Sequence, residues 1–312
     1  SPLPPTQLSP SRLEILTRCH QRSCGKLRPT CMNAKVETSE VSNMVPLVYN
    51  DSWIDRRLQS YMEHSINRAL QHAANRDRSE LGEEPMPWTS DCEGSSEYDQ
   101  MIASAVRLAR RKGSQTRELT LNLLRDSFPP WFPRAFGSFL RLFPLWFDAR
   151  HAAVSTVFLT RWLVGESRVV DADPNLLDPV QEGQGKWGND PVGWVPGFLL
   201  GGNWRQEKGA GQGVQITRCR VLEQTNCVSV CCNVCKVPTQ NFFTNDIGLP
   251  LTMIPDYENL GCTFVFGATP PPIEKDEAFQ HPCMKLCSLN IHGRSEEDVA
   301  DKACSRLDIS EK

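Results

Sequence analysis

Residues 214–266 read VQITRCRVLEQTNCVSVCCNVCKVPTQNFFTNDIGLPLTMIPDYENLGCTFVF, and this stretch decides the fold. Its apolar and β-branched runs predict three short strands, at 214–222, 251–254 and 262–266. The cysteine-bearing run between them, opened by Thr225 or Asn226, predicts a helix that ends before Pro238. Pro238 then opens a second helix that Gly248 ends. A last short helix is expected to carry Cys283 and Cys287.

Upstream of this stretch the apolar spacing is helical. It predicts helices near 54–73, 98–109 and 119–124, then near 133–143 and 148–165, with an exposed acidic linker at 77–97. The expected fold is therefore α+β, with a helical N-terminal portion followed by a small cysteine-rich α/β C-terminal portion. The expected divisions are a leader at 1–46, a helical region at 47–165, a Gly/Trp-rich loop or insertion at 166–213, a cysteine-rich domain at 214–290 and a tail at 291–312.

Composition and charge exclude several classes of protein. The net charge of −3 gives no global field that would recruit nucleic acid. No uncharged apolar run is long enough for a helix to span a bilayer. The leader is rich in arginine and serine and has few acids, which is typical of an organelle transit peptide. An ordinary disordered tail is the alternative interpretation.

Aromatic residues are concentrated between residues 128 and 162. Helical spacing places several of them on one face, and arginines interrupt the run. We predict that they line a long apolar pocket for a substrate or lie in a membrane interface, with a plain hydrophobic core as the alternative. The predicted substrate-binding residues are Trp131, Phe132, Phe136, Phe139, Phe143 and Trp162.

Nine of the 13 cysteines lie between Cys219 and Cys304, which suggests thiol or metal chemistry. On an α-helix Cys227, Cys231 and Cys235 share one face, but the outer two are roughly 12 Å apart along the axis, too far for one ion. Adjacent members of such a series can share a metal. One arrangement joins Cys231 and Cys235 to the pair Cys283 and Cys287, with Cys219 and Cys262 in reserve. Cysteines packed as small hydrophobic residues are the alternative.

The segment Cys219-Arg-Val-Leu-Glu-Gln-Thr-Asn-Cys227, with the cysteines that follow it, resembles the plant and algal β-carotene isomerase family of the Dwarf-twenty-seven type. So do Met253-Ile-Pro255, the strand from Cys262 to Gly267, Pro270-Pro-Pro272 and the segment from Pro282 to Cys287. Upstream, Tyr49-Asn-Asp-Ser-Trp53 and Trp162-Leu-Val-Gly165 are also similar to the family. The resemblance spans about residues 47–288, apart from the Gly/Trp-rich insertion.

This resemblance implies a plastid enzyme that contains iron and interconverts all-trans- and 9-cis-β-carotene, the step that opens strigolactone biosynthesis. It implies a carotenoid substrate, and we expect a plastid membrane surface and an electron donor as further partners. The matching cysteines, taken as metal ligands, are Cys219, Cys227, Cys231, Cys235, Cys262, Cys283 and Cys287. Whether the iron is mononuclear or part of an iron–sulfur cluster stays open.

Isomerisation requires a temporary loss of double-bond order. Iron that exchanges one electron with the polyene would cause this, and reversible addition of a thiolate is the competing mechanism. Glu223 and Asn226, beside the first cysteines, are predicted to hydrogen-bond near the site. Two other functions stay open: a non-enzymatic iron or iron–sulfur protein that transfers electrons or binds pigment, and a plastid protein regulated by thiol oxidation.

Overall fold

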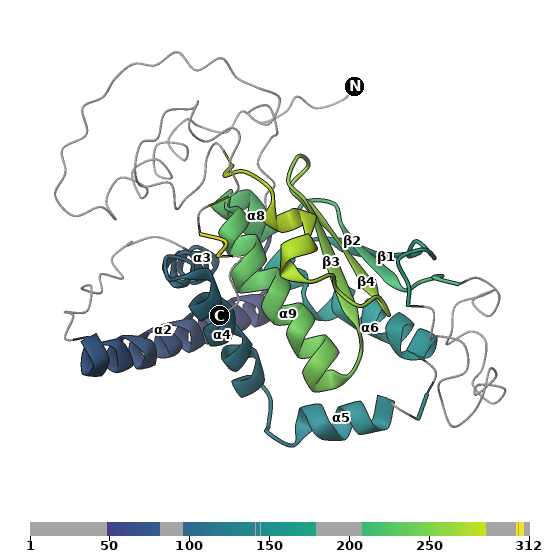
Figure 1. The fold of residues 1–312 in the computed structure, drawn as a ribbon, viewed down its shortest axis with the longest axis horizontal. Coiled ribbons are helices and arrows are strands. Elements are labelled where there is room, and N and C mark those ends of the chain that lie inside the picture. Colours follow the sequence, from purple (N-terminus) through teal and green to yellow (C-terminus); the bar gives the residue numbers. More distant parts are fainter. Residues whose placement is uncertain are drawn as a thin grey trace, which may run out of the picture.

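The computed structural model describes residues 49–81, 96–140, 142–143, 145–178, 208–284, 304 and 306–308. It confirms the α+β class: helices from the N-terminal portion precede a four-stranded antiparallel sheet, whose strand order is β1-β2-β4-β3 (Figure 1). The leader at 1–46 and most of the Gly/Trp-rich loop and the tail lie outside the described residues, so their predicted roles stay predictions.

Within the described residues the N-terminal portion has six helices: α2 (Trp53–Leu81), α3 (Glu97–Leu108), α4 (Gly113–Asp126), α5 (Phe132–Leu140), α6 (Leu145–Leu159) and α7 (Arg161–Val164). Ser96 and Asp99 form a capping box that fixes the start of α3. The prediction that the linker begins at residue 77 is wrong, because α2 continues to Leu81. No described helix combines the length and the hydrophobicity needed to cross a membrane.

The sheet consists of β1 (Ser167–Val170), β2 (Gly213–Ile216), β3 (Leu251–Asp256) and β4 (Gly261–Phe266). The predicted strands at 251–254 and 262–266 are confirmed as the hairpin β3–β4, in which Met253 faces Phe264. β2 pairs with the other edge of β4, with Val214 also opposite Phe264. β1, which the sequence analysis placed in a loop, closes the sheet beside β2.

The predicted strand 214–222 is wrong in its second half. The chain leaves the sheet after Ile216, and Arg220–Thr225 form the short helix α8. Asn226 ends α8 in the left-handed conformation, with φ of 44°, so it terminates one helix rather than opening the next. Asn is one of the few residues that adopts this conformation at little cost.

The cysteine-bearing helix also differs from the prediction. Val230–Lys236 (η4) are wound as a π-helix and continue without a break into α9 (Val237–Asn241) and a second π-helix, η5 (Phe242–Ile247). Pro238 therefore lies inside a continuous helical segment, in the first turn of α9, and the helix does not end before it as predicted. Gly248, with φ of 85°, ends the segment, as predicted.

Two hydrophobic cores join the helical portion to the cysteine-rich portion. In the first, Ala149 and Ala153 of α6 pack with residues from one face of the sheet, among them Val214 and Phe264. In the second, Tyr98 of α3 and other residues from α2 and α3 pack with Val221, Cys227 and Val230. The cavity described next lies where these elements meet.

Candidate functional site

Four thiols converge on a small cavity between the sheet and the helical segment 220–247. Its lining comprises Val164, Ile216, Cys219, Val221, Leu222, Cys231, Cys235, Lys236, Met253, Pro255, Gly261, Cys262 and Phe264. The cavity offers about 20 Å³ to the centres of water molecules, which is room for about one. Apart from the four sulfur atoms and one lysine, every lining residue is apolar or a glycine.

The four cysteines reach the cavity from three parts of the backbone. Cys219 lies at the N-cap of α8, where its N–H donates a hydrogen bond to the carbonyl of Leu260 at 2.6 Å. Cys231 and Cys235 project from the π-helix η4, four residues apart. Cys262 comes from β4, in register with Ile216 of β2. The chain therefore assembles four sulfur atoms from a cap, a helix and a strand.

The π-helix is fixed to the sheet beside the cavity. Lys236 donates a hydrogen bond to the carbonyl of Met253, and Gln240 accepts one from the N–H of the same residue at 2.8 Å. The Lys236 ammonium also forms a buried ion pair with Asp276 at 2.7 Å. A buried ion pair whose charges are both hydrogen-bonded holds its elements in one arrangement. These contacts keep Cys231 and Cys235 facing β4.

Burial keeps the four thiols protonated. Desolvation raises the pKa of Cys219 to about 12 and raises the pKa values of Cys235 and Cys262 well above the ordinary range for thiols. A hydrogen bond with Cys232, together with burial, raises the pKa of Cys231 in the same direction. All four cysteines carry free thiols. The cavity therefore presents neutral sulfur at physiological pH, which is a poor nucleophile.

The other predicted metal-binding cysteines lie elsewhere or outside the described residues. Cys227 is buried in the core between α3 and η4. Cys283 is partly buried beside a third core and lies in a non-helical segment, so the predicted helix is wrong at this residue. Cys287 falls outside the described residues. Cys232 does not line the cavity: its sulfur lies 3.2 Å from the Tyr257 hydroxyl.

The donor set around the cavity suits a soft metal in its chemistry, since it is all sulfur. As the side chains lie, however, no three His, Cys, Asp or Glu residues within the described part of the chain are arranged to hold an ion. The present arrangement therefore does not fit a bound metal. The iron site and its seven cysteine ligands stay predictions.

Glu223 and Asn226 were predicted to hydrogen-bond near the cysteines. Glu223 accepts a hydrogen bond from the Tyr49 hydroxyl at 3.1 Å and pairs with Arg218 at 2.7 Å. Asn226 donates from its side chain to the carbonyl of Glu223. Neither residue lines the cavity. Their contacts fix α8 and the residues that lead into it, and they do not reach the sulfur atoms of the cavity.

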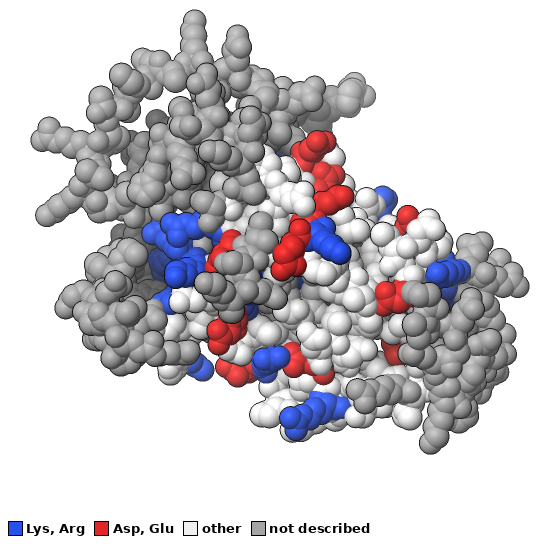
Figure 2. All heavy atoms as spheres, in the orientation of Figure 1, with Lys and Arg blue, Asp and Glu red and all other residues white. Residues whose placement is uncertain are grey.

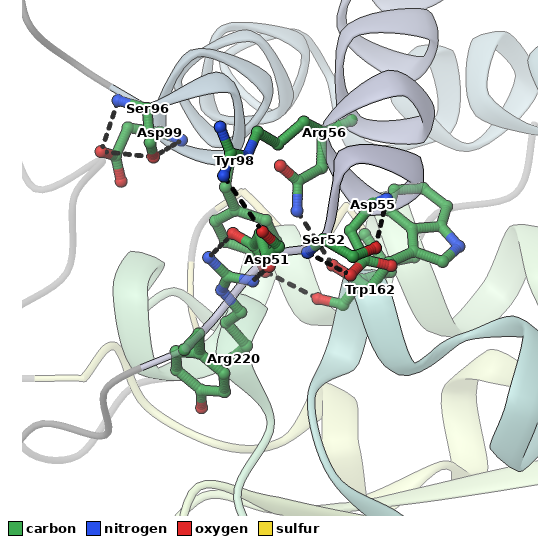
Figure 3. Close-up of polar contacts among 12 residues, drawn as sticks. Asp51, Ser52, Asp55, Arg56, Ser96, Tyr98, Asp99, Trp162 and Arg220 are labelled. Carbon is green, nitrogen blue, oxygen red and sulfur yellow. Dashed lines mark hydrogen bonds and ion pairs between the residues drawn. The ribbon is translucent and has the colours of Figure 1, made fainter.

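Sequence reasoning missed a buried arginine next to the cavity. The Arg220 guanidinium lies over the rings of Tyr98 and Tyr49, at 3.5 and 4.4 Å from the ring centroids, and pairs in a bidentate manner with Asp51 at 2.6 and 2.8 Å (Figure 3). The bonds from Arg220 lower the pKa of Asp51. This cluster ties the first described residues and α3 to the residue that follows Cys219. The sequence shows that Asp51 and Arg220 are charged, but their positions in it do not indicate that the two form an ion pair.

Four of the predicted substrate-binding aromatics lie in two groups of contacting rings. Phe128, Phe132 and Phe136 stack with ring centroids 5.2 and 5.3 Å apart. In the second group Phe139 meets Phe143 edge-on at 5.2 Å, and Phe143 stacks on Phe147 at 5.0 Å. Trp131 is exposed at the start of α5. Trp162 is apart from them, packed against the core between α2 and α3. None of the six predicted residues lines the thiol cavity, and their role in substrate binding stays a prediction.

Comparison with known proteins connects the cavity to one family. Residues 195–275 match the family described as "Beta-carotene isomerase D27-like, C-terminal". The chain is 29% identical over 269 residues to the protein named "Beta-carotene isomerase D27, chloroplastic" of Arabidopsis thaliana, covering 85% of this chain and 81% of the relative. It is 27% identical over 242 residues to the protein of the same name from Medicago truncatula, covering 77% and 75%.

No solved structure matches the chain significantly. Every residue of the cavity lining except Val164 lies inside the matched segment 195–275. The residues that assemble the four thiols thus coincide with the part of the chain that carries the family signature, and the similarity to the two plant proteins extends through most of the helical portion. The C-terminal part of the chain thus matches the D27-like β-carotene isomerase family, and most of the chain is similar to the two plant proteins.

Proposed function

We propose that this protein is a carotenoid cis/trans isomerase that interconverts all-trans- and 9-cis-β-carotene or a close relative. The observation that carries the proposal is the position of the four-thiol cavity inside the segment shared with the family. The names of the two plant relatives supply the reaction. We also infer a plastid location, since both relatives are named as chloroplastic proteins.

The size of the cavity limits where the substrate can lie. A C40 polyene does not fit into a space for about one water molecule. We infer that the hydrocarbon lies against the aromatic residues of α5 and of the segment that follows. The cavity then either opens to admit part of the polyene or acts on it through the residues that line the cavity. Aromatic side chains suit this task because they offer large apolar faces with few rotatable bonds.

The protonation of the thiols bears on the two candidate mechanisms. Nucleophilic addition of sulfur to a polyene requires a thiolate, and burial raises the pKa values of the four cavity thiols away from that form. In the absence of a bound metal, this environment disfavours thiolate addition at neutral pH.

Iron is a separate proposal. It is supported by four soft sulfur donors facing one cavity, but as the side chains lie no three described donors hold an ion, so no step above depends on it. An electron donor is a partner only if iron is present. The test is metal analysis of freshly purified protein and of cysteine variants, given in the Discussion.

Two other functions are separated from isomerisation by experiment. A pigment-binding or electron-transfer protein would bind carotenoid or iron and leave the isomer ratio unchanged. A thiol-regulated protein would change the oxidation state of the cavity cysteines without turning over carotenoid; the convergence of four free thiols is the observation that favours it. Chromatographic separation of β-carotene isomers after incubation with the purified full chain tests the main proposal.

A further inference from the structure

α5 presents an aromatic surface to solvent. The surface, which we call the aromatic rim, consists of Phe128, Trp131, Phe136, Phe139 and Leu142, all exposed. Trp131 and Phe139 are 66% and 53% exposed. Exposed apolar side chains are common singly, but a group of large ones on consecutive turns usually marks an interaction site. α5 lies at the periphery of the molecule, below η5 and α6 (Figure 1).

The contacts of α5 with the body fix which side of the helix faces outward. Gly137 packs so closely on η5 that a Cβ atom there would lie 2.5 Å from the carbonyl oxygen of Ile247. Phe128 stacks on Phe242 of η5 at 5.4 Å. The contacts of Gly137 and Phe128 thus fix α5 against η5. Phe139 could turn inward only if these contacts broke.

The charged residues within the rim segment are basic, and the exposed Asp126 lies just before it. Residues 127–147 contain Arg134 and Arg141 and no Asp or Glu. Arg134 is exposed on α5 itself. The next acid along the chain, Asp148, is buried, and Asp246 of η5 is paired with Arg125 at 3.0 Å. In Figure 2 the lower edge of the molecule, over α5, shows uncharged atoms with a basic patch, and acidic atoms lie nearby.

We propose that the aromatic rim docks on the surface of a lipid bilayer that contains anionic lipids. An amphipathic helix with large aromatic residues and cationic side chains binds at the boundary between acyl chains and headgroups, where apolar burial and attraction to negative charge add. A second copy of the chain would bring the exposed Arg134 of each copy toward a basic surface. A free carotenoid would contact the rings but offers no group to this arginine.

This inference rests on the proposed function in one respect: a carotenoid dissolved in a bilayer would reach the protein through this surface. The docking itself does not require catalysis. Binding to vesicles is therefore measured without carotenoid, and isomerisation is measured separately in detergent without a bilayer. A failure of membrane docking can then be distinguished from a failure of the proposed isomerase activity.

The test is co-sedimentation of the full chain with vesicles of pure phosphatidylcholine and with vesicles that also contain phosphatidylglycerol. We expect binding to the anionic vesicles that weakens as salt is raised, because the headgroup attraction is screened. Trp131→Ala should weaken it about tenfold, since a Trp side chain is no longer buried among the lipids. Trp53→Ala removes a tryptophan that is 74% exposed on α2 and should leave binding unchanged.

Arg134→Gln should reduce binding to anionic vesicles and leave binding to neutral ones unchanged, whereas Arg57→Gln, on the exposed surface of α2, should change neither. Circular dichroism of each variant checks that it is folded. Equal binding by the wild type, Trp131→Ala and Arg134→Gln would overturn the inference. So would wild-type protein that ignores anionic vesicles but self-associates in their absence through a contact that Trp131→Ala abolishes.

Discussion

The guanidinium of Arg220 lies 3.5 Å from the centroid of the Tyr98 ring, although the two residues are far apart in the sequence. Arg220 directly follows Cys219, whose side chain lines the thiol cavity, and Tyr98 belongs to the buried face of α3. The helical portion therefore contacts the cysteine-rich portion one residue from the candidate site. This relationship makes the stability of the helical portion a condition for the geometry of the cavity.

Substitution of Arg220 should destabilise the protein strongly. Arg220→Ala removes two hydrogen bonds to Asp51 and two cation–π contacts from a side chain that is only 5% exposed. We expect the free energy of unfolding to fall by about 2–4 kcal/mol, and by less for Arg220→Lys, which keeps the charge but not the planar fork. Urea denaturation measures both. Arg168→Ala, which removes an exposed arginine from β1, is the control and should cost well under half as much.

The cavity thiols should resist alkylation in the folded protein. Because burial raises their pKa values, little thiolate is present at neutral pH, and the cavity that they line is small. Mass spectrometry after brief iodoacetamide treatment should find Cys219, Cys231, Cys235 and Cys262 unmodified in the native chain and modified in urea. Rapid native labelling of these four residues would contradict the described site.

Metal content should depend on the residues that line the cavity. If the iron proposal holds, Cys231→Ser and Cys235→Ser should each lose most of the bound iron, since both sulfur atoms face the cavity. Cys232→Ser is a matched control from the same π-helix, because its sulfur contacts Tyr257 instead. Elemental analysis of anaerobically purified protein gives the stoichiometry. Retention of full iron by all three variants would place the metal elsewhere, and a metal-free wild type would remove the proposal.

Asp148 should make stability depend on pH. This carboxyl group is 5% exposed on α6, its Oδ1 atom has no hydrogen-bond partner, and burial raises its pKa from 3.8 to about 7. The folded state therefore holds a proton that the unfolded state loses near pH 4. Its contribution is greatest below that pH, and stability should fall as pH rises through about 7, by on the order of 1–4 kcal/mol.

Asp148→Asn should flatten this dependence, because the amide does not ionise. Asp126→Asn, at the exposed end of α4, serves as the control and should keep the wild-type slope. Urea unfolding between pH 5 and pH 8 provides the measurement. An unchanged slope in Asp148→Asn would show that another group titrates.

The sequence predicted the parts of the fold that depend on local pattern. The β-branched and apolar runs around Leu251 and Cys262 indicated the hairpin, and Gly248 marked the end of the long helix. The sequence could not show that this segment is a π-helix, because the four-residue spacing of Cys231 and Cys235 is compatible with both an α-helix and a π-helix. Pro238 predicted the end of a helix, but the chain continues through it from η4 into α9.

The candidate site was predictable only in its residue types. Four of the seven proposed cysteine ligands line one cavity, yet the sequence did not separate them from Cys227, which packs into a core three residues before the π-helix begins. The pairing of Arg220 with Asp51 and Tyr98 joins segments that only the folded chain brings together. Long-range contacts of this kind leave no periodic signal in one sequence.

The central claim is tested most directly by incubating purified full-length protein separately with all-trans- and with 9-cis-β-carotene in detergent, and resolving the isomers by chromatography over time. A catalyst of this interconversion speeds both directions, so the two reactions should converge on one isomer ratio much faster than heat-treated controls. Unchanged isomer ratios in both reactions, from freshly purified protein shown to be folded, would contradict the account.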